Sequence, residues 1–215
     1  MHDLTEDQLA IAATTRAFAR EHLAPNAVAW DQAKHFPVDV LRKAADVGLA
    51  GVYVREESGG SGLTRADGVL VFEALATGCP SIAAYLSIHN MVAWMIDRYG
   101  DDAQRTRWLP GLSAMATPAS YCLTEPGAGS DAAALTTRAR RDGAHWVLDG
   151  VKQFISGAGV SRVYLVMART GGPGAGGVSA FVVERDGAGG GGGAPGGDLV
   201  WGHPPPPPPQ PGAGR

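Results

Sequence analysis

The stretch ASYCLTEPGAGSD, residues 119–131, holds the point where the pattern of the chain changes from helix to strand. Before Thr117 apolar residues recur with helical spacing, and after it short aliphatic, aromatic and threonine-rich runs alternate with glycine turns. Short strands joined by tight turns are typical of antiparallel sheets, and no helix pattern separates them as a βαβ fold requires. The sequence therefore predicts an α+β protein, an N-terminal all-α helical domain followed by a small antiparallel, barrel-like β domain.

The sequence before Thr117 contains residues typical of helix ends. Thr5 begins a capping box with Gln8, and Thr64 and Asp101 occupy positions that cap helix N-termini. Gly48 follows an apolar helical run where a left-handed cap is expected. Helices are expected over about residues 5–24, 37–47, 64–77, 81–99 and 101–110. Strands are expected over residues 119–123, 135–140, 145–148, 151–156, 163–169 and 178–184, with turns at 142–143, 149–150, 157–159 and 171–174.

Composition limits the class of protein. The chain has 215 residues, of which 45% are hydrophobic and 18% charged, and a net charge of −3. Such a chain can bury a core, and it lacks the basic stripe of a nucleic-acid binder. We expect a helical domain over residues 1–117, an incomplete middle β domain over 118–186, and a low-complexity disordered tail over 187–215.

The tail has an unusual composition. It holds 11 of the 31 glycines and 8 of the 15 prolines, including six consecutive prolines at 204–209. Such a segment cannot bury enough apolar surface to offset its ordering entropy. Its proline run fits a polyproline II ligand of SH3 or WW modules. The abrupt change in composition at the end of a strand favours the other interpretation, a reading-frame artefact.

The two cysteines favour a reducing compartment, and neither a metal site nor a membrane span is expected. Cys79 and Cys122 lie in separate apolar runs and indicate no disulfide framework. The histidines show no metal-ligand spacing, so no metal is expected. The longest apolar stretch, residues 81–96, is interrupted by His89 and Asn90, which argues against a membrane span. The N-terminus begins with a helix signal, and no transit or signal peptide is expected.

Two short motifs have the composition of a ligand site. Residues 127–132 fit a loose G-x-G-x-x-G/A fingerprint, but a nicotinamide site needs a strand directly before it and a helix directly after it. A loop that cradles an anionic or carbonyl ligand, or an ordinary turn, fits better. Residues 152–157, KQFISG, offer an aromatic ring and a hydroxyl to a planar cofactor, or form an ordinary strand end. Residues 87–96 pack a core or line an apolar pocket, and His89 there is interpreted as a buried histidine.

Taken together, these segments resemble the acyl-CoA dehydrogenases. Residues 121–131 are similar to the flavin-loop signature of that family, and residues 154–157 to its second flavin element. Residues 72–80, 87–97 and 166–174 resemble its isobutyryl-CoA branch most closely. The resemblance covers about residues 3–186.

The resemblance implies FAD as cofactor and a third, C-terminal helical domain. It implies that the hydroxyl of Thr124 and the backbone of Leu123 meet the pyrimidine edge of the flavin, that Phe154 packs on the ring, and that Ser156 donates toward N5. It also implies that Ser130 contacts the acyl-CoA. The implied flavin-binding residues are Tyr121, Cys122, Leu123, Thr124, Glu125, Pro126, Gly127, Ala128, Gly129, Ser130, Phe154, Ile155 and Ser156.

The implied reaction is α,β-dehydrogenation of a short branched acyl-CoA such as isobutyryl-CoA, in valine or fatty-acid catabolism, with electrons passing to electron-transferring flavoprotein. The family's catalytic glutamate belongs to the C-terminal domain, which this sequence lacks, so no catalytic residue is assigned and the chain alone is expected to be inactive. The alternatives are a non-catalytic flavin- or acyl-CoA-binding fragment that associates with full-length subunits, and an oxidase that reduces oxygen. The resemblance also implies a homotetramer and the mitochondrial matrix; without it, the cytoplasm is expected.

Overall fold

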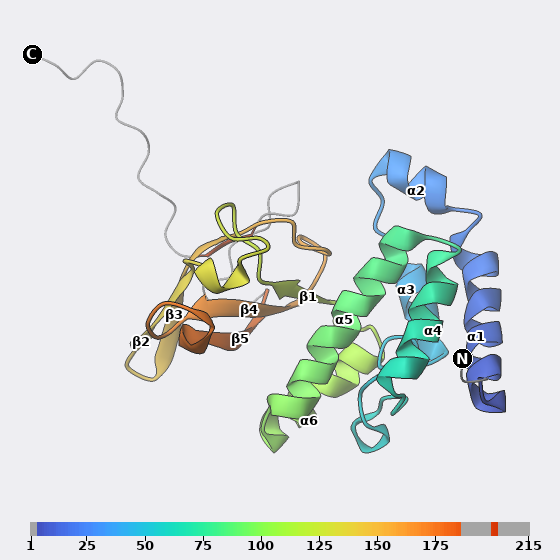
Figure 1. Ribbon diagram of the computed structural model, residues 1–215, viewed down its shortest axis with the longest axis horizontal. Coiled ribbons are helices and arrows are strands. Elements are labelled where there is room, and N and C mark those ends of the chain that lie inside the picture. The colour runs from blue at the N-terminus through green and yellow to red at the C-terminus, as the bar shows by residue number, and fades with distance from the viewer. Residues whose placement is uncertain (1–3, 186–198, 202–215) are drawn as a thin grey trace, which may run out of the picture.

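A computed structural model describes residues 4–185 and 199–201 of the chain. Helices form the first half and a sheet the second, and the two lie on opposite sides of the molecule (Figure 1). The predicted α+β class, a helical part followed by a small β part, is confirmed.

The helical half follows the predicted caps. Thr5, Thr64 and Asp101 each accept a hydrogen bond from the backbone N–H of the third residue of a helix, and the side chain of that residue accepts one from the backbone N–H of the cap residue. Gly48 has a φ of 80°, as the predicted left-handed cap requires. The helical elements are α1 (Glu6–Phe18), the π-helical η1 (Ala19–Leu23), α2 (Ala27–Ala33), α3 (Val38–Asp46), the 3-10 turn η2 (Glu56–Ser58), α4 (Arg65–Ala76), α5 (Pro80–Tyr99) and α6 (Asp102–Ser113).

Two helices depart from the prediction. Helix α2 was not expected, because it contains no buried residue and so leaves no apolar periodicity in the sequence. Helix α6 was expected to end near Pro110, but it continues to Ser113. Proline lacks a backbone donor, yet the carbonyl of Pro110 still accepts a hydrogen bond from Ala114 N at 3.2 Å, so one further turn forms.

The sheet is mixed, whereas an antiparallel one was predicted. The strands are β1 (Ala119–Cys122), β2 (Arg138–Asp142), β3 (His145–Lys152), β4 (Val163–Arg169), β5 (Val178–Glu184) and β6 (Leu199–Trp201), with 3-10 turns η3 (Ala132–Ala134) and η4 (Ala175–Gly177). Their order is β1-β4-β2-β3-β6, with β5 also paired to β4. The β2–β3, β4–β5 and β3–β6 pairs are antiparallel, but β4 runs parallel to β1. The β2–β3 hairpin lies between β1 and β4 in the chain and allows β4 to return in the direction of β1.

The predicted turn at Asp149–Gly150 is wrong, because β3 runs straight through it. A Cβ on Gly150 would lie 2.3 Å from Thr137 Oγ1, so the glycine permits a close approach between neighbouring strands instead of a turn. Within the segment predicted as a disordered tail, residues 199–201 form β6, which pairs with β3. The rest of the tail lies outside the described residues.

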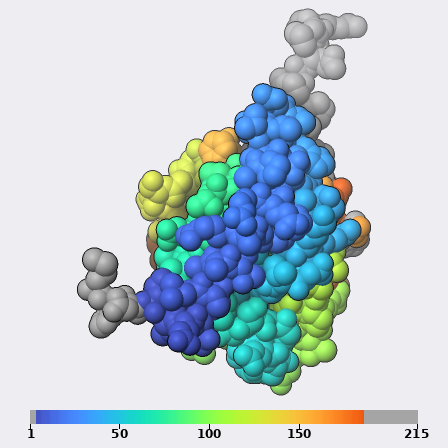
Figure 2. All heavy atoms as spheres, turned by 90° about the vertical axis from the view of Figure 1, so that its right-hand side faces the viewer, coloured from blue at the N-terminus to red at the C-terminus, as the bar shows by residue number. Residues whose placement is uncertain are grey.

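Helices and sheet share one apolar core. Val92 and Ile96 of α5 and Leu112 of α6 are buried with Val163 and Leu165 of β4. Figure 1 accordingly has α5 beside β1, while α1 and α2 cover much of the face in Figure 2. Packing against the helices therefore positions β1 and the start of the loop that follows it. None of the helices in the described part of the chain is long and apolar enough to cross a membrane.

Candidate functional site

The loop after β1 and the end of β3 lie side by side. Strand β1 leads into residues 123–131, and β3 leads into residues 153–157; we refer to these two stretches as the paired segments. The backbone N–H of Gln153 donates to the Thr124 carbonyl at 2.8 Å, and Lys152 Nζ donates to the Leu123 carbonyl at 2.9 Å. The structure thus brings together the two motifs that the sequence singled out separately.

A buried ion pair joins the loop after β1 to the last residue of β3. Lys152 Nζ lies 2.8 Å from Glu125 Oε1, and these side chains are 0% and 4% exposed. Burial by itself raises the pKa of Glu125, but hydrogen bonds from Lys152 and from Thr136 and Thr137 outweigh it and lower the pKa to about 2. Burial lowers the pKa of Lys152, against the attraction of Glu125. The Glu125 carboxylate is therefore held in its charged form.

The loop beyond this ion pair turns tightly and leaves its tip open. Glu125 and Ala128 exchange backbone hydrogen bonds of 3.0 and 3.1 Å, which close a short turn around Pro126 and Gly127. A Cβ added at Gly127 or at Gly129 would have no heavy atom within 4 Å. The space above both glycines is therefore free for a ligand to approach the backbone.

Phe154 is exposed in a backbone conformation that side chains rarely adopt. Its side chain is 75% exposed and its φ is 58°, in the left-handed region. An exposed aromatic ring and a strained backbone both cost free energy, and such residues are concentrated at ligand sites. The ring offers a flat apolar surface beside the loop.

Two buried serines hold the backbone of Ser156, two residues after Phe154. Ser120 Oγ is 2.6 Å from the Ser156 carbonyl and 2.7 Å from Ser161 Oγ, and both Ser120 and Ser161 are fully buried. Ser156 and Gly157 also line a cavity of about 320 Å³, which Tyr85 of α5 and the region of α2 close from the other side. The Ser156 backbone is therefore fixed against β1, and its side chain remains half-buried.

The predicted site residues divide by burial. Buried are Cys122, Glu125, Ala128 and Ile155; half-buried are Tyr121, Leu123, Thr124 and Ser156; exposed are Pro126, Gly127, Gly129, Ser130 and Phe154. Cys122 and Ile155 pack in one core cluster with Tyr164 and Val166, and burial raises the pKa of the Cys122 thiol to about 12. These two residues support the site from inside, and the exposed and half-buried ones form its surface.

Sequence reasoning missed the residues that hold this surface in place. Lys152 was quoted within its motif without a role, and Ser120, Ser161, Thr136 and Thr137 were not considered. The one available signal was a lysine and a glutamate of opposite charge, each within a predicted ligand motif and each beside apolar residues.

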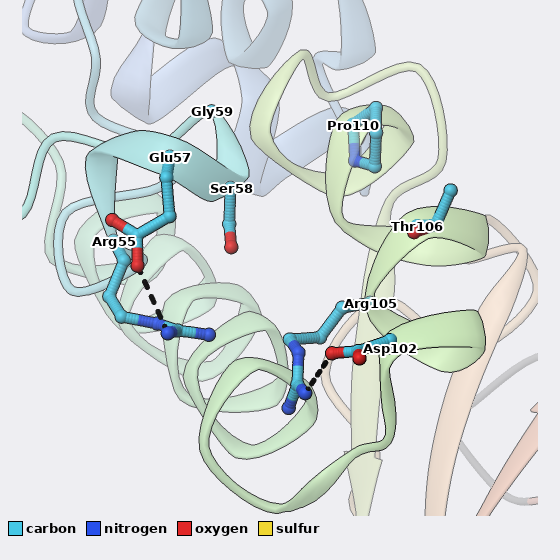
Figure 3. A pocket seen from close by; sticks show the side chains of 8 residues that line it. All are labelled: Arg55, Glu57, Ser58, Gly59, Asp102, Arg105, Thr106 and Pro110. Atoms are coloured by element: carbon cyan, nitrogen blue, oxygen red, sulfur yellow. Dashed lines mark hydrogen bonds and ion pairs between the residues drawn. The ribbon is translucent and has the colours of Figure 1, made fainter.

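A larger cavity, of about 580 Å³, lies elsewhere, between η2 and α6 (Figure 3). Arg55 pairs with Glu57 at 3.0 Å and Arg105 with Asp102 at 2.6 Å, and the figure shows the two pairs facing each other across the opening. Because each arginine is already matched by a carboxylate, this cavity has little net charge to attract an ionic ligand.

Two family models match the chain, one over its helical half and one over its β half. The family model of the acyl-CoA dehydrogenase N-terminal domain matches residues 5–116, and that of the acyl-CoA dehydrogenase middle domain matches residues 120–194. The mitochondrial isobutyryl-CoA dehydrogenase of Bos taurus is 53% identical over 182 residues, which are 85% of this chain and 44% of that protein. The corresponding Dictyostelium discoideum protein is 52% identical and matches 86% of this chain and 45% of its own length.

A solved structure shares the fold. The glutaryl-CoA dehydrogenase from Mycobacterium smegmatis in complex with FADH2 superposes with a TM-score of 0.80 at 31% identity, over 86% of this chain and 47% of that one. The chain spans less than half the length of the two curated relatives. Since the two family models together account for most of its residues, the chain belongs to the acyl-CoA dehydrogenase family.

Proposed function

We propose that this chain forms the flavin-facing part of an FAD-dependent acyl-CoA dehydrogenase for a short branched acyl-CoA such as isobutyryl-CoA. In this proposal residues 1–117 form the helical domain and residues 118–186 the middle domain that holds the flavin. The observation that carries it is the hydrogen bond from Gln153 N to the Thr124 carbonyl, which sets an exposed aromatic ring beside an open glycine loop. The identity to two isobutyryl-CoA dehydrogenases supports the choice of substrate.

The surface of the paired segments fits the isoalloxazine ring. That ring is planar and apolar on its faces and polar at its edge, and Phe154 offers an exposed face beside polar groups. When bound, FAD supplies the acceptor for the hydride that leaves the β-carbon of the acyl group. The chain's own residues bind and orient: Thr124 and the Leu123 backbone at the pyrimidine edge, and the Ser156 hydroxyl toward N5.

The remaining loop residues complete the proposed site. Phe154 covers the ring and excludes water, which strengthens every hydrogen bond beneath it. Tyr121 is half-buried, and burial raises its pKa, so it stays a neutral phenol. Ser130, exposed beyond the two glycines, is suited to contact the acyl-CoA. Donors fixed before the reaction lower the free energy of the negative charge that develops on a reduced flavin.

The buried carboxylate of the loop is not suited to remove the α-proton. Glu125 is the glutamate of the loop, and both of its oxygens already accept hydrogen bonds, from Lys152 and Thr137 on one and from Thr136 on the other. Its pKa of about 2 makes it a poor base at neutral pH. This observation favours, as a second candidate, a fragment that binds flavin or acyl-CoA without catalysis and associates with full-length subunits.

The proposal extends to partners and location. Electrons would pass to electron-transferring flavoprotein, and the full-length protein would form a homotetramer. The two curated relatives are named as mitochondrial proteins, which supports a location in the mitochondrial matrix.

Anaerobic flavin spectroscopy tests the proposal. The purified chain is titrated with FAD, and isobutyryl-CoA is then added, with straight-chain butyryl-CoA as the comparison. Binding of FAD supports the flavin-facing role. Because the catalytic base is expected in the C-terminal domain, we expect no bleaching by isobutyryl-CoA; bleaching would show that the chain alone is an active dehydrogenase and would exclude the non-catalytic fragment. Turnover that needs oxygen supports an oxidase. Failure to bind either FAD or acyl-CoA overturns both candidates.

A further inference from the structure

We propose that Lys152 and Glu125 are positioning residues for the flavin: their ion pair locks the loop after β1 against the end of β3 in the arrangement that receives the ring. This inference rests on the proposed function. It assigns to the pair a role in flavin affinity that is separate from its contribution to folding.

The lysine holds the loop at two points on either side of Thr124. Its Nζ donates to the Leu123 carbonyl at 2.9 Å and to Glu125 Oε1 at 2.8 Å. Between them, the Thr124 carbonyl accepts from Gln153 N at 2.8 Å. Three consecutive residues of the loop are thus held by two consecutive residues of the strand end, and the polar edge proposed for the flavin lies within the held stretch.

The glutamate fixes the other end of the loop. Glu125 Oε2 accepts from the Thr136 backbone at 2.6 Å and from the Thr136 hydroxyl at 2.7 Å, and Oε1 accepts from Thr137 N at 2.8 Å. These contacts take up the backbone donors of residues 136 and 137, which explains why β2 begins at Arg138 and not at the predicted Leu135. The open glycines 127 and 129 lie in a loop whose two ends meet at one carboxylate.

Burial makes this arrangement specific. An apolar pair could fill the same volume at no loss of stability, so stability alone does not require charges here. The five hydrogen bonds of Lys152 and Glu125 form together in only one position of the loop relative to β3, because hydrogen bonds depend on direction. Apolar contacts do not, and they would allow the loop to shift along β3. A displacement of about 1 Å at a binding surface is enough to cost a large factor in the affinity or rate of a planar ligand site.

The structure offers a matched control. Asp97 of α5 is also a buried carboxylate, 4% exposed, that pairs with a cation, Arg55, at 2.9 Å. It lies in the helical half and contacts neither of the paired segments in the hydrogen bonds of the described residues. Glu125→Gln and Asp97→Asn therefore make the same chemical change, carboxylate to amide, at and away from the proposed flavin site.

The test measures FAD affinity and folding separately on the full chain. The dissociation constant is obtained from quenching of flavin fluorescence, and the unfolding midpoint from urea titration without FAD. We expect Glu125→Gln to raise the dissociation constant about tenfold or more and Asp97→Asn to change it less than about twofold. Lys152→Arg, which keeps the charge, is expected to recover part of the affinity that Lys152→Met loses. Hydrogen exchange of residues 124–130 in the flavin-free chain should quicken in Glu125→Gln alone.

The outcomes separate this inference from the proposed function. A wild-type chain that binds no FAD overturns the proposed function and this inference with it. A wild-type chain that binds FAD no better than Glu125→Gln overturns the inference alone. If Glu125→Gln fails to fold, the double variant Glu125→Gln/Lys152→Met takes its place, since it removes the ion pair without leaving a buried charge unpaired; we then expect a rise in the dissociation constant of about tenfold, and an unchanged value overturns the inference.

Discussion

The imidazole Nδ1 of His89 accepts a hydrogen bond from the backbone N–H of Ala119 at 3.1 Å. The other ring nitrogen, Nε2, lies 3.0 Å from the Leu112 carbonyl and must carry the hydrogen, because Nδ1 is the acceptor. One fully buried side chain of α5 therefore binds both the end of α6 and the first residue of β1, the strand that leads into the loop at residues 123–131.

This geometry predicts a loss of stability in mild acid. Burial lowers the pKa of His89 to about 4, although the hydrogen bond to Leu112 acts in the opposite direction. Between the unfolded value of about 6.5 and pH 4 the unfolded chain binds more protons than the folded one, so stability falls as the pH falls through this window. At pH 5 the loss from this residue should be about 2 kcal/mol.

The variant His89→Gln isolates this contribution, since glutamine is neutral throughout. The free energy of unfolding of both proteins is measured in urea at pH 7 and at pH 5. The amount by which the free energy of unfolding of the wild type exceeds that of the variant should be about 2 kcal/mol smaller at pH 5 than at pH 7. A constant difference would show that His89 titrates normally and that the buried contact does not form.

Asn90, the neighbour of His89, should be intolerant of apolar replacement. Its Oδ1 accepts from Val52 N at 2.7 Å, and its Nδ2 donates to the carbonyls of Leu49 and Leu86, each at 2.8 Å. Asn90→Leu keeps the branched shape of the side chain but removes the hydrogen-bond partners of the buried Val52 N–H and Leu49 carbonyl. We expect a loss of about 3 kcal/mol in urea unfolding, despite the more apolar side chain. Ser87→Leu on the same helix, at a partly exposed position, should change stability far less.

The sequence predicted the elements whose signals are local. The three N-terminal caps at Thr5, Thr64 and Asp101 depend on residues within one turn of each other, and all three are confirmed. Strands β4 and β5 have the predicted bounds, because their apolar runs are flanked directly by glycine and polar turns. The two ligand motifs, residues 127–132 and 152–157, were also recognised from their local sequence. Their contact with a flavin remains a prediction.

What the sequence could not predict depends on contacts between distant residues. The pair Asp149–Gly150 is typical of a turn. Only the close approach of Thr137, just before β2, explains why a glycine stands at position 150 inside β3. Lys152 and Glu125 are 27 positions apart, and their ion pair forms only because the chain returns through the β2–β3 hairpin. The parallel pairing of β1 with β4 has the same origin.

Phe154→Gly should separate folding from flavin binding. Glycine relieves the left-handed backbone, worth about 1–2 kcal/mol, and increases the entropy of the unfolded chain by a similar amount, so the net change in stability should stay within about 1 kcal/mol. The exposed ring contributes no core packing that could be lost. FAD affinity, in contrast, should fall, and Phe154→Trp should retain it because indole keeps a flat face. If Phe154→Gly binds FAD as tightly as the wild type does, the Phe154 ring does not contribute to the proposed site.

The strand end beyond Phe154 depends on one glycine for space and on another only for conformation. Gly157 and Gly159 have nearly the same φ, 81° and 82°. A Cβ on Gly157 would lie 2.5 Å from Tyr85 Cε2 and 2.7 Å from Ser161 Oγ. A Cβ on Gly159 would have no heavy atom within 4 Å. Gly159→Ala should therefore cost about 1 kcal/mol through backbone strain alone. Gly157→Ala carries the same strain plus overpacking of a buried wall, a further loss of about 1–3 kcal/mol, and it should displace Ser156 and weaken FAD binding. Urea unfolding and fluorescence titration of both variants measure the two effects, and equal losses of stability would mean that Gly157 does not face Tyr85 and Ser161 as described.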